Sequence, residues 1–395
     1  MRAAFIHDHN FVYNEEDGNY YDGSGGAFDE NLWRRYLQIF DKLDVVGRQV
    51  EKLPNRLVVS SCENVTFRLI PSAHGVKNLL RNRKSIITQL QRVIESVDFC
   101  IIRLPSTLGT WAAEVCRVTH KKYVVEVVGD AFEAYWYHGS LLGKLIAPFQ
   151  MFKMKSVVNK APYAIYVTKG ALQKKYPCEG QSVSISNVFL SEVIEEGQVR
   201  DFYSKTRSHF VIGMIGTFHA RYKGHHELIK ALRYIIDQGA KNVEVNLVGS
   251  GDSSWVVELS KKYGVEANIK FLGVLPSGGK GVFPFLDNLD LYVHPSLTEG
   301  LPRVVIEAMS RGRICVASDA GGTAELLNQD EIHKAGDWKK LAKDVLNIYN
   351  LESEDRVRLA LKNLHISRSY VEEFLQNKRV KYLSSIINKS NGSAE

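Results

Sequence analysis

Short apolar runs alternate with amphipathic stretches along most of the chain. An apolar run between turn residues predicts a buried strand, and apolar residues at spacings of three and four predict a helix that packs by one face. The apolar runs predict strands at residues 2–7, 45–46, 57–60, 65–70, 98–104, 122–128, 163–168, 182–188, 211–215, 243–248, 269–272, 289–293 and 314–318. The amphipathic stretches predict helices at residues 30–40, 86–94, 108–119, 225–238, 254–263, 302–311, 338–349 and 369–388. Strands and helices that alternate in this way predict an α/β fold with parallel, doubly wound sheets.

The alternation lapses between residues 192 and 208, where charged residues replace the apolar pattern. We place a domain boundary there. A chain of 395 residues, 45% hydrophobic and 24% charged, is long enough for two globular cores and has an ordinary globular composition. The two domains are expected at residues 1–195 and 205–368.

The stretch 289–309 carries the clearest candidate chemistry. It reads LDLYV followed by HPSLTEGLPRVVIEAM, which predicts a strand, a loop and a helix with Pro302 in its first turn. Ligands of open α/β sheets bind at the carboxyl ends of strands, so this loop is a candidate site. Glu299 lies in the loop, and Glu307 lies on the helix, with seven residues between them.

A sugar nucleotide would fit these groups. The first N–H groups of a helix lack internal partners and favour an anion such as phosphate, while the two carboxylates suit sugar hydroxyls. The alternative is an acidic residue that favours a helix start and a solvated glutamate on the outer face. For Glu299 or Glu307 taken alone, that alternative is the better interpretation.

Together with its surroundings, the segment Glu299-Gly-Leu-Pro-Arg-Val-Val-Ile-Glu307 resembles the Glu-x7-Glu motif of the retaining glycosyltransferases of family four. The resemblance implies the GT-B arrangement, in which two Rossmann-like domains face each other across a cleft. Residues 1–195 would then form the acceptor side, residues 205–368 would bind the donor, and the terminal helix within 369–395 would cross back onto the first domain.

The resemblance also implies roles for the residues of this motif. Glu299 would contact the donor sugar, and Glu307 would contact the ribose hydroxyls. Gly300, Leu301 and Pro302 would present the helix N-terminus to the phosphates. His294, which ends the preceding strand, and Ser296 are further substrate-binding candidates, although a histidine at a strand end is more often structural.

The loop 216–224 matches the donor site of the same family. Its cations, Arg221 and Lys223, would neutralise the negative charge that develops on a departing diphosphate. Relatives commonly carry arginine directly after the first glycine of this loop, Gly216, and lysine before the second. Here Thr217 stands at the arginine position, so we expect Arg221 to substitute for that arginine, and Lys223 matches the family lysine.

Glycine pairs mark three further loops. Gly249 and Gly251 resemble the Gly-x-Gly turn where the family's backbone approaches the nucleotide. Gly25 and Gly26, in a polar loop 14–26, match a pair that closes over the donor diphosphate, although a flexible loop has the same composition. The segment 321–325, Gly-Gly-Thr-Ala-Glu, resembles one that closes the site behind the helix, and a turn with a solvated glutamate fits it equally well.

Asp130 follows the buried strand predicted at residues 122–128. Because parallel sheets place function at the carboxyl ends of their strands, Asp130 is a candidate acceptor-site or catalytic residue. A carboxylate that caps the following helix is an equally good interpretation.

Residues 135–160 combine aromatic and aliphatic residues with four lysines and no acid. This composition suits a helix at an anionic membrane surface, and equally a core helix with a solvated lysine edge. Tyr135, Trp136 and Tyr137 would also suit stacking on an acceptor sugar. The formal charge of +7 is compatible with phosphorylated substrates, an anionic membrane or nucleic acid.

Metal and compartment signals are sparse. No Asp-x-Asp pair follows a strand and no His/Cys cluster has ligand spacing, and the family resembled is metal-independent, so neither metal nor cofactor is expected. Five scattered cysteines indicate reduced thiols of a cytosolic protein. The first apolar stretch is too short for a signal peptide, and no stretch reaches membrane-spanning length. We therefore expect a cytoplasmic protein that can associate with the inner face of the membrane.

The sequence thus predicts a retaining glycosyltransferase. The expected donor is a nucleoside diphosphate sugar, UDP favoured over GDP, and the expected acceptor is a hydroxyl of a lipid-linked saccharide in capsule, O-antigen or exopolysaccharide synthesis. A sugar-nucleotide epimerase of the same architecture is the first alternative. A basic membrane- or nucleic-acid-binding protein is the second, and a nucleic-acid partner is not expected.

Overall fold

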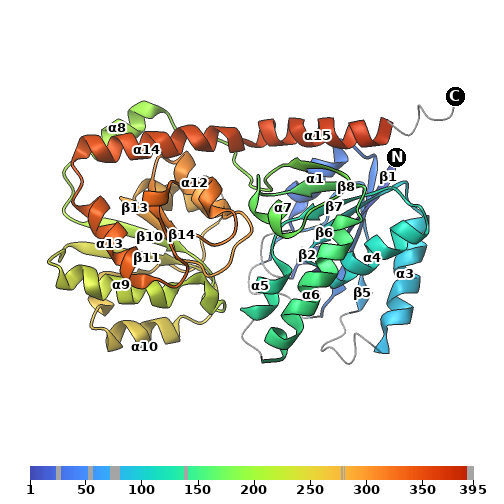
Figure 1. The fold of residues 1–395 in the computed structure, drawn as a ribbon, viewed down its shortest axis with the longest axis horizontal. Helices are drawn as coiled ribbons and strands as arrows, with labels where there is room; N and C mark the ends of the chain where they lie inside the picture. The colour runs from blue at the N-terminus through green and yellow to red at the C-terminus, as the bar shows by residue number, and fades with distance from the viewer. Residues whose placement is uncertain are drawn as a thin grey trace.

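The computed structural model of the chain describes residues 1–23, 28–51, 57–71, 81–137, 141–276, 279 and 281–388. These residues form two α/β lobes that lie side by side, each around its own sheet (Figure 1). The predicted boundary at residues 192–208 falls between the last strand of the first sheet and the first strand of the second.

The first lobe contains a parallel sheet with one antiparallel addition. Its strands are β1 (Arg2–Asn14), β2 (Asn19–Asp22), β3 (Lys42–Gln49), β4 (Val65–Phe67), β5 (Ile70–Pro71), β6 (Phe99–Leu104), β7 (Tyr123–Val127), β8 (Tyr163–Tyr166) and β9 (Gln181–Ser184). They are arranged in the order β4-β3-β1-β6-β7-β8-β9, with β5 paired to β3 and β2 antiparallel to β1. The order reverses at β1, so a crevice opens at the carboxyl ends of β1 and β6.

Helices cover both faces of this sheet. They are α1 (Glu30–Leu37), α3 (Arg83–Glu95), α4 (Thr107–Val118), α5 (Ala131–Trp136), α6 (Leu141–Asn159) and α7 (Ala171–Lys175). On one side α4 packs against α3 and α6, and α5 packs against α6. The first half of α4 is buried on all sides, from Leu108 to Ala113, and its last turn is exposed at Arg117 and Val118.

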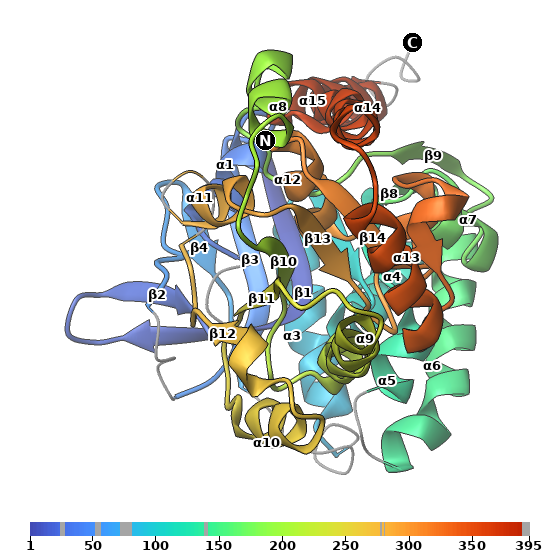
Figure 2. The same ribbon diagram turned by 90° about the vertical axis from the view of Figure 1, so that its left-hand side faces the viewer.

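A hairpin occupies most of the region predicted as a polar loop at residues 14–26. β1 continues to Asn14, and Tyr13 and Val12 pair with Tyr20 and Tyr21 of β2. The turn is closed by Gly18 at φ +71°, a conformation that glycine adopts without strain. Figure 2 shows the hairpin projecting from the side of the molecule. The loop prediction was wrong for residues 19–22, because the polar stretch contains two tyrosines, which favour a β-strand.

The second lobe has an all-parallel sheet. Its strands are β10 (Phe210–Ile215), β11 (Val243–Val248), β12 (Ile269–Phe271), β13 (Leu291–His294), β14 (Ile314–Ser318) and β15 (Ile332–His333). They are arranged in the order β12-β11-β10-β13-β14-β15, so the strand order reverses between β10 and β13. This is the doubly wound arrangement of dinucleotide-binding domains, and it confirms the predicted fold class for this lobe.

The helices that follow the boundary in the chain are α8 (Glu196–Tyr203), α9 (His225–Asp237), α10 (Ser254–Lys262), α11 (Val282–Asp287), α12 (Arg303–Ser310), α13 (Trp338–Tyr349), α14 (Ser353–Ser367) and α15 (Glu372–Asn388). α9 packs against α10 and α13, and α12 packs against α14, on opposite sides of the sheet (Figure 1). The charged stretch in which we place the domain boundary contains α8, which begins with a capping box of Glu195 and Gln198.

α15 belongs in space to the first lobe, although the chain reaches it from the second. Figure 1 shows α14 and α15 running along one edge of the molecule, α15 beside α1. Gln376 donates to the carbonyl of Arg35 at 2.7 Å, and Arg379 donates to the carbonyl of Ser186 at 3.2 Å. Leu375 belongs to the apolar core of the first lobe.

Candidate functional site

The reversal point of the second sheet brings together the loops that follow β10, β11 and β13. β10 and β13 are paired neighbours, so the loop after Ile215 and the loop after His294 begin side by side at the carboxyl edge. α12 starts from the same edge. Such an edge is where open parallel sheets bind ligands, because diverging connections leave a crevice there.

Glu299 is the centre of a compact charged cluster at this edge. Its Oε1 accepts a hydrogen bond from Lys223 Nζ at 2.7 Å and lies 2.8 Å from His294 Nε2. Burial by itself raises the pKa of Glu299, but the charge of Lys223 and the contact with His294 outweigh it. The net pKa lies well below the ordinary glutamate value. Glu299 is therefore an ionised carboxylate held in a fixed position.

The loop that carries Glu299 is tied to the lysine loop. The hydroxyl of Ser296, which is fully buried, donates to the carbonyls of Tyr222 at 3.3 Å and Thr298 at 3.0 Å. Leu297 N donates to the same Tyr222 carbonyl at 2.7 Å. Ser296, predicted as a substrate-binding residue, is thus engaged in joining the two loops, and its contact with substrate stays a prediction.

The lysine loop also contacts the Gly-x-Gly turn after β11. Thr217 Oγ1 donates to the carbonyl of Ser250 at 3.0 Å, and Gly216 N donates to Val248 O at 2.9 Å. A Cβ on Gly249 would overlap the Gly216 carbonyl oxygen, and Gly251 has φ +102°, so this close approach requires glycine. The backbone of both loops is therefore compact around the position of Lys223.

The two cations of this loop lie in different places. Lys223 contacts Glu299, whereas the exposed Arg221 lies over the Trp255 ring, 4.9 Å from its centroid. A short 3₁₀ turn at Arg221–Lys223 places them on different sides of the loop. The substitution of Arg221 for the family arginine missing at Thr217 stays a prediction, and its present contact is with the aromatic ring.

The N-terminus of α12 is free to meet an anion. Pro302 is the N-cap rather than the first helical residue, and among the described residues no side chain caps the helix. Leu301 is buried beneath it. The N–H groups of Arg303 and Val304 therefore begin the helix with the positive end of its dipole exposed to the loop.

Glu307 lies one to two turns into α12 and is half-buried. Burial raises its pKa to about 7, and the positive charge of Arg303 opposes this rise. The two glutamates of the motif thus differ in charge state: Glu299 is ionised by its cationic partners, and Glu307 is poised to titrate near neutral pH.

The loops of this site also contact the first lobe. Thr298, the residue before Glu299 in the sequence, donates from Oγ1 to Glu133 Oε2 of α5 at 2.6 Å. Glu325 accepts hydrogen bonds from Gly170 N at 2.8 Å and Ala171 N at 2.7 Å, at the start of α7. Glu325 was expected in a segment that closes the site, whereas the role of Glu133 was missed, because a contact between lobes leaves no local pattern in the sequence.

We expect Gly300→Ala to lower the activity of this site by about 10- to 100-fold, the effect of overpacking by 1–3 kcal/mol. A Cβ at Gly300 would overlap the carbonyl oxygen of Val128 in the first lobe, so the lobes would be pushed apart at the site. Gly197→Ala is the matched control, because no heavy atom lies within 4 Å of a Cβ there. Steady-state rates of the two variants provide the check, and equal rates would show that this contact does not matter.

Asp130 caps α5. Its carboxylate accepts hydrogen bonds from Phe132 N at 2.8 Å and from the Tyr176 hydroxyl at 2.7 Å, and it forms an ion pair with Lys175. The capping interpretation is confirmed, and a direct catalytic role for Asp130 stays a prediction.

The first lobe has polar groups at its own reversal point. Asp8, after the buried part of β1, accepts from Leu108 N at 3.0 Å at the start of α4 and from Arg48 Nε at 2.8 Å. Next to it, His7 stacks on Phe28, and burial lowers the His7 pKa to about 4. These residues were missed, although His-Asp-His directly after an apolar run is a signal. Gly25 and Gly26 lie outside the described residues.

Within the described ranges, no group of three or more His, Cys, Asp or Glu side chains is arranged to hold a metal ion. No helix in that part of the chain is long and apolar enough to span a bilayer. All five cysteines are free thiols, and Cys100, Cys116 and Cys315 are buried.

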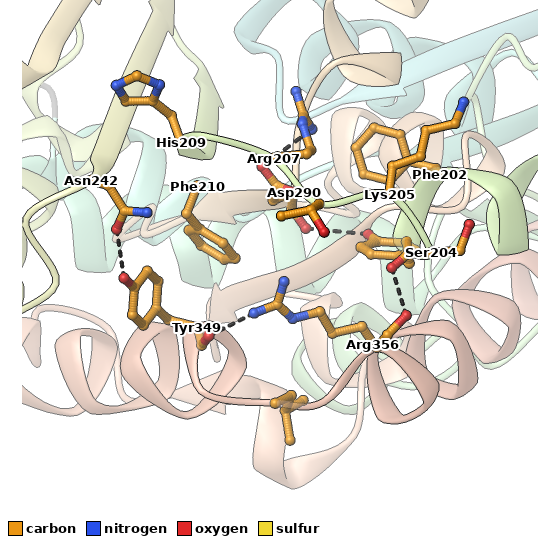
Figure 3. A pocket seen from close by; sticks show the side chains of 14 residues that line it. Phe202, Ser204, Lys205, Arg207, His209, Phe210, Asn242, Asp290, Tyr349 and Arg356 are labelled. Atoms are coloured by element: carbon orange, nitrogen blue, oxygen red, sulfur yellow. Dashed lines mark hydrogen bonds and ion pairs between the residues drawn. The ribbon is translucent and has the colours of Figure 1, made fainter.

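A separate hollow of about 370 Å³ lies at the opposite edge of the second sheet (Figure 3). Its two arginines already have partners: Arg207 pairs with Asp290 at 3.2 Å, and Arg356 donates to the Tyr349 carbonyl at 2.6 Å. Phe210 and Asp290 mark the amino ends of β10 and β13, so this hollow is remote from the carboxyl-edge loops and is not part of the candidate site.

Similarities to known proteins agree with this geometry. Residues 209–350 match the family described as glycosyl transferases group 1. Protein CapJ of Staphylococcus aureus is 37% identical over 386 residues, which cover 97% of this chain and 95% of CapJ. The capsular polysaccharide biosynthesis glycosyltransferase CapM of the same species is 24% identical over 251 residues, which cover 62% of this chain and 65% of CapM.

A solved structure extends the likeness to the whole fold. HepE of Anabaena, crystallised in complex with UDP and glucose, superposes with a TM-score of 0.69 at 17% identity, covering 98% of this chain and all of HepE. The likeness covers both lobes, and it confirms the expected GT-B arrangement of two Rossmann-like domains.

Proposed function

This chain belongs to the group 1 glycosyl transferases, and on that premise we propose that it transfers a sugar from a UDP-sugar to a hydroxyl of a lipid-linked saccharide in capsular polysaccharide synthesis, with retention of configuration. The observation that carries the proposal is the cluster of Glu299, Lys223 and His294 beside the uncapped start of α12. CapM, which is named for capsular polysaccharide biosynthesis, and HepE, which binds UDP and glucose, support the pathway and the nucleotide.

Each group of the site has a distinct task in this proposal. The amides at the start of α12 and the ammonium of Lys223 receive the diphosphate, where negative charge grows as the sugar leaves. Glu299, fixed by Lys223 and His294, accepts hydrogen bonds from hydroxyls of the donor sugar. Glu307 accepts hydrogen bonds from the ribose. The contacts of Thr298 and Glu325 with the first lobe hold the acceptor side against these groups.

The chemistry needs no nucleophile from the protein. In the proposed step, the bond between the anomeric carbon and the diphosphate oxygen breaks while the acceptor oxygen attacks from the same face. The acceptor proton passes to the departing phosphate. Lys223 and the helix dipole stabilise the negative charge of the leaving diphosphate, as a metal ion does in other transferases. We therefore propose a metal-independent reaction.

Thermal stabilisation by nucleotides tests the donor site directly. A ligand that binds only the folded state raises the melting temperature. We expect UDP to stabilise the protein more than GDP, dTDP or ADP, with the same shift in the presence of EDTA. A melting-temperature shift with GDP alone would show that the donor is a GDP-sugar instead of a UDP-sugar. A shift that EDTA abolishes would refute metal independence. No shift with any nucleotide would contradict the whole proposal.

The second stage follows the sugar. Labelled UDP-sugars are incubated with a lipid-linked saccharide fraction, and the anomeric configuration of the product is read from its NMR coupling constant. Retention supports the proposal, and inversion refutes its mechanism. Conversion of the UDP-sugar into its epimer without any acceptor would favour the epimerase alternative.

A further inference from the structure

α6 leaves its largest apolar side chains in solvent. Leu145, Phe149 and Phe152 are 78%, 65% and 63% exposed, far more than such residues normally are in a folded protein. We call the exposed large apolar residues of α6, together with Trp136 of α5, the α6 face: Trp136, Leu141, Leu142, Leu145, Phe149 and Phe152. Leu142, Leu145, Phe149 and Phe152 recur at spacings of three and four, so they share one side of the helix.

The opposite side of α6 packs against the first lobe with smaller residues. Gly143, Ala147, Met154 and Val158 are buried there. The helix therefore has two apolar sides, one packed inside the protein and one bare. A core helix with a solvated lysine edge, the alternative that the sequence left open, would bury its leucines and phenylalanines, and α6 does the reverse.

The segment that carries the α6 face has charges of a single sign. Residues 134–178 contain seven lysines and no aspartate or glutamate. Lys144, Lys155 and Lys160 are exposed, and Lys144 lies 5.6 Å from the centroid of the Trp136 ring. On a helix with about 3.6 residues per turn, Lys144 and Lys155 lie along one edge of the apolar stripe, and the partly exposed Lys153 lies along the other. A bare apolar stripe edged by lysines is the arrangement of helices that lie in the interface of an anionic bilayer.

We propose that the α6 face binds the surface of an anionic phospholipid bilayer. The leucine and phenylalanine side chains enter the boundary between headgroups and acyl chains, and the lysines contact the phosphates. The lysines beside the apolar stripe favour an anionic bilayer over an uncharged apolar partner, because an uncharged partner would gain nothing from their charge.

The α6 face is connected to the donor site through α5. α5 packs against α6, and Trp136 of the face stacks on Phe132 one turn earlier. The same short helix carries Glu133, which bonds Thr298 beside Glu299. Figure 1 shows α5 and α6 at the edge of the first lobe nearer the second lobe. A bilayer on this face would therefore deliver a lipid-linked acceptor near the site, a consequence that rests on the proposed function, whereas bilayer binding itself does not.

Vesicle flotation tests the proposal with the full chain. The probes are vesicles of phosphatidylcholine alone and of phosphatidylcholine with phosphatidylglycerol. We expect the protein to bind the anionic vesicles at least about tenfold more strongly, because each lysine near the surface contributes about fivefold. We expect the triple variant Leu145→Ser, Phe149→Ser, Phe152→Ser to lose at least about tenfold of that binding.

Two controls accompany the triple variant. The double variant Val118→Ser, Phe374→Ser removes side chains that are 69% and 57% exposed on other helices, and it should bind vesicles like the original protein. Lys144→Gln with Lys155→Gln should weaken binding by about 20-fold and reduce its dependence on salt. Stabilisation by UDP should persist in every variant, which shows that the fold is intact.

Three results would overturn the proposal: equal binding of the triple variant and the original protein, equal binding to neutral and anionic vesicles, or a dimer in light scattering that the triple variant abolishes. The last result would assign the face to a second copy of the chain. A protein that binds vesicles but is not stabilised by any nucleotide would leave this inference standing and refute the proposed function instead.

Discussion

Replacing Lys223 by alanine is expected to slow sugar transfer by about 100- to 1,000-fold, the usual effect of removing one preorganised charge partner of a leaving group. Lys223 Nζ donates to Glu299 Oε1 at 2.7 Å, in the loop that approaches the start of α12. Without it, the diphosphate would lose its neutralising cation and Glu299 would lose one of its two partners. The measurement is the steady-state rate with the UDP-sugar that the donor screen selects.

Arg221→Ala is the matched control, since it removes a cation of the same loop that lies over Trp255 instead. We expect it to change the rate by less than about fivefold, the effect of an exposed charge worth under 1 kcal/mol. If Arg221→Ala were as damaging as Lys223→Ala, Arg221 would be the functional substitute for the arginine that Thr217 displaces, and the assignment of roles within the loop would have to be exchanged.

Stability and function can be separated at this pair. Lys223→Ala leaves Glu299 partly buried with His294 alone, and breaking a buried ion pair costs up to about 3–5 kcal/mol. The double variant Lys223→Ala, Glu299→Gln removes the unpaired charge, so we expect its melting temperature to recover while its activity does not. A rate that recovered together with stability would reduce Lys223 to a structural residue.

Replacing Glu307 by glutamine is expected to weaken UDP binding by about 10- to 150-fold, because it removes a charge-assisted hydrogen bond worth about 1.5–3 kcal/mol. Isothermal calorimetry measures the affinity. Glu244→Gln is the control: Glu244 is also half-buried, but it lies on β11 and is paired with Lys270 at 2.7 Å. Equal losses in the two variants would refute the assignment of the ribose to Glu307.

The pH dependence gives Glu307 a signature of its own. Burial raises its pKa from 4.5 to about 7, and ribose hydroxyls that donate to the carboxylate favour its ionised form. UDP binding therefore releases a proton, and affinity should fall by up to about tenfold per pH unit below 7. Glu307→Gln should lack this slope. The titration of the nucleotide phosphate is common to both proteins and cancels in their difference.

The unliganded protein should respond in the opposite sense. The pKa of Glu307 is higher in the folded protein than in the unfolded chain. Ionisation of Glu307 therefore lowers the stability of the folded protein progressively as pH rises from about 4.5 to about 7. We therefore expect Glu307→Gln to be the more stable protein at pH 8, although it binds UDP more weakly. Lower stability of the variant at that pH would contradict the raised pKa.

Three elements with a buried face were predicted to the residue. The strands at 243–248 and 314–318 and the helix at 338–349 have the bounds that the apolar pattern predicts, because burial alone decides them. α14 was missed since its buried residues, Ala360, Asn363, Leu364 and Ser367, include polar and small side chains that carry little apolar signal.

The candidate site was predictable as a set of residues but not as an arrangement. Glu299 and His294 were identified in one segment and Lys223 in another, and the paired strands β10 and β13 place the three within hydrogen-bonding distance. The engagement of Ser296 with Tyr222, and of Glu133 with Thr298, depends on how loops and lobes approach each other. No local periodicity encodes such distances, so only the structure shows them.

The position of α15 has a consequence for how the chain is made. Leu375, Leu383 and Ile386 complete the apolar core of the first lobe, yet they are synthesised after the entire second lobe. A nascent first lobe, although it holds every strand of its sheet, therefore emerges from the ribosome with part of its core uncovered. Because exposed apolar surface on a partly folded domain promotes aggregation, the two lobes cannot mature independently in the order of translation. The first lobe can therefore complete its folding only after α15, the last helix, has been synthesised.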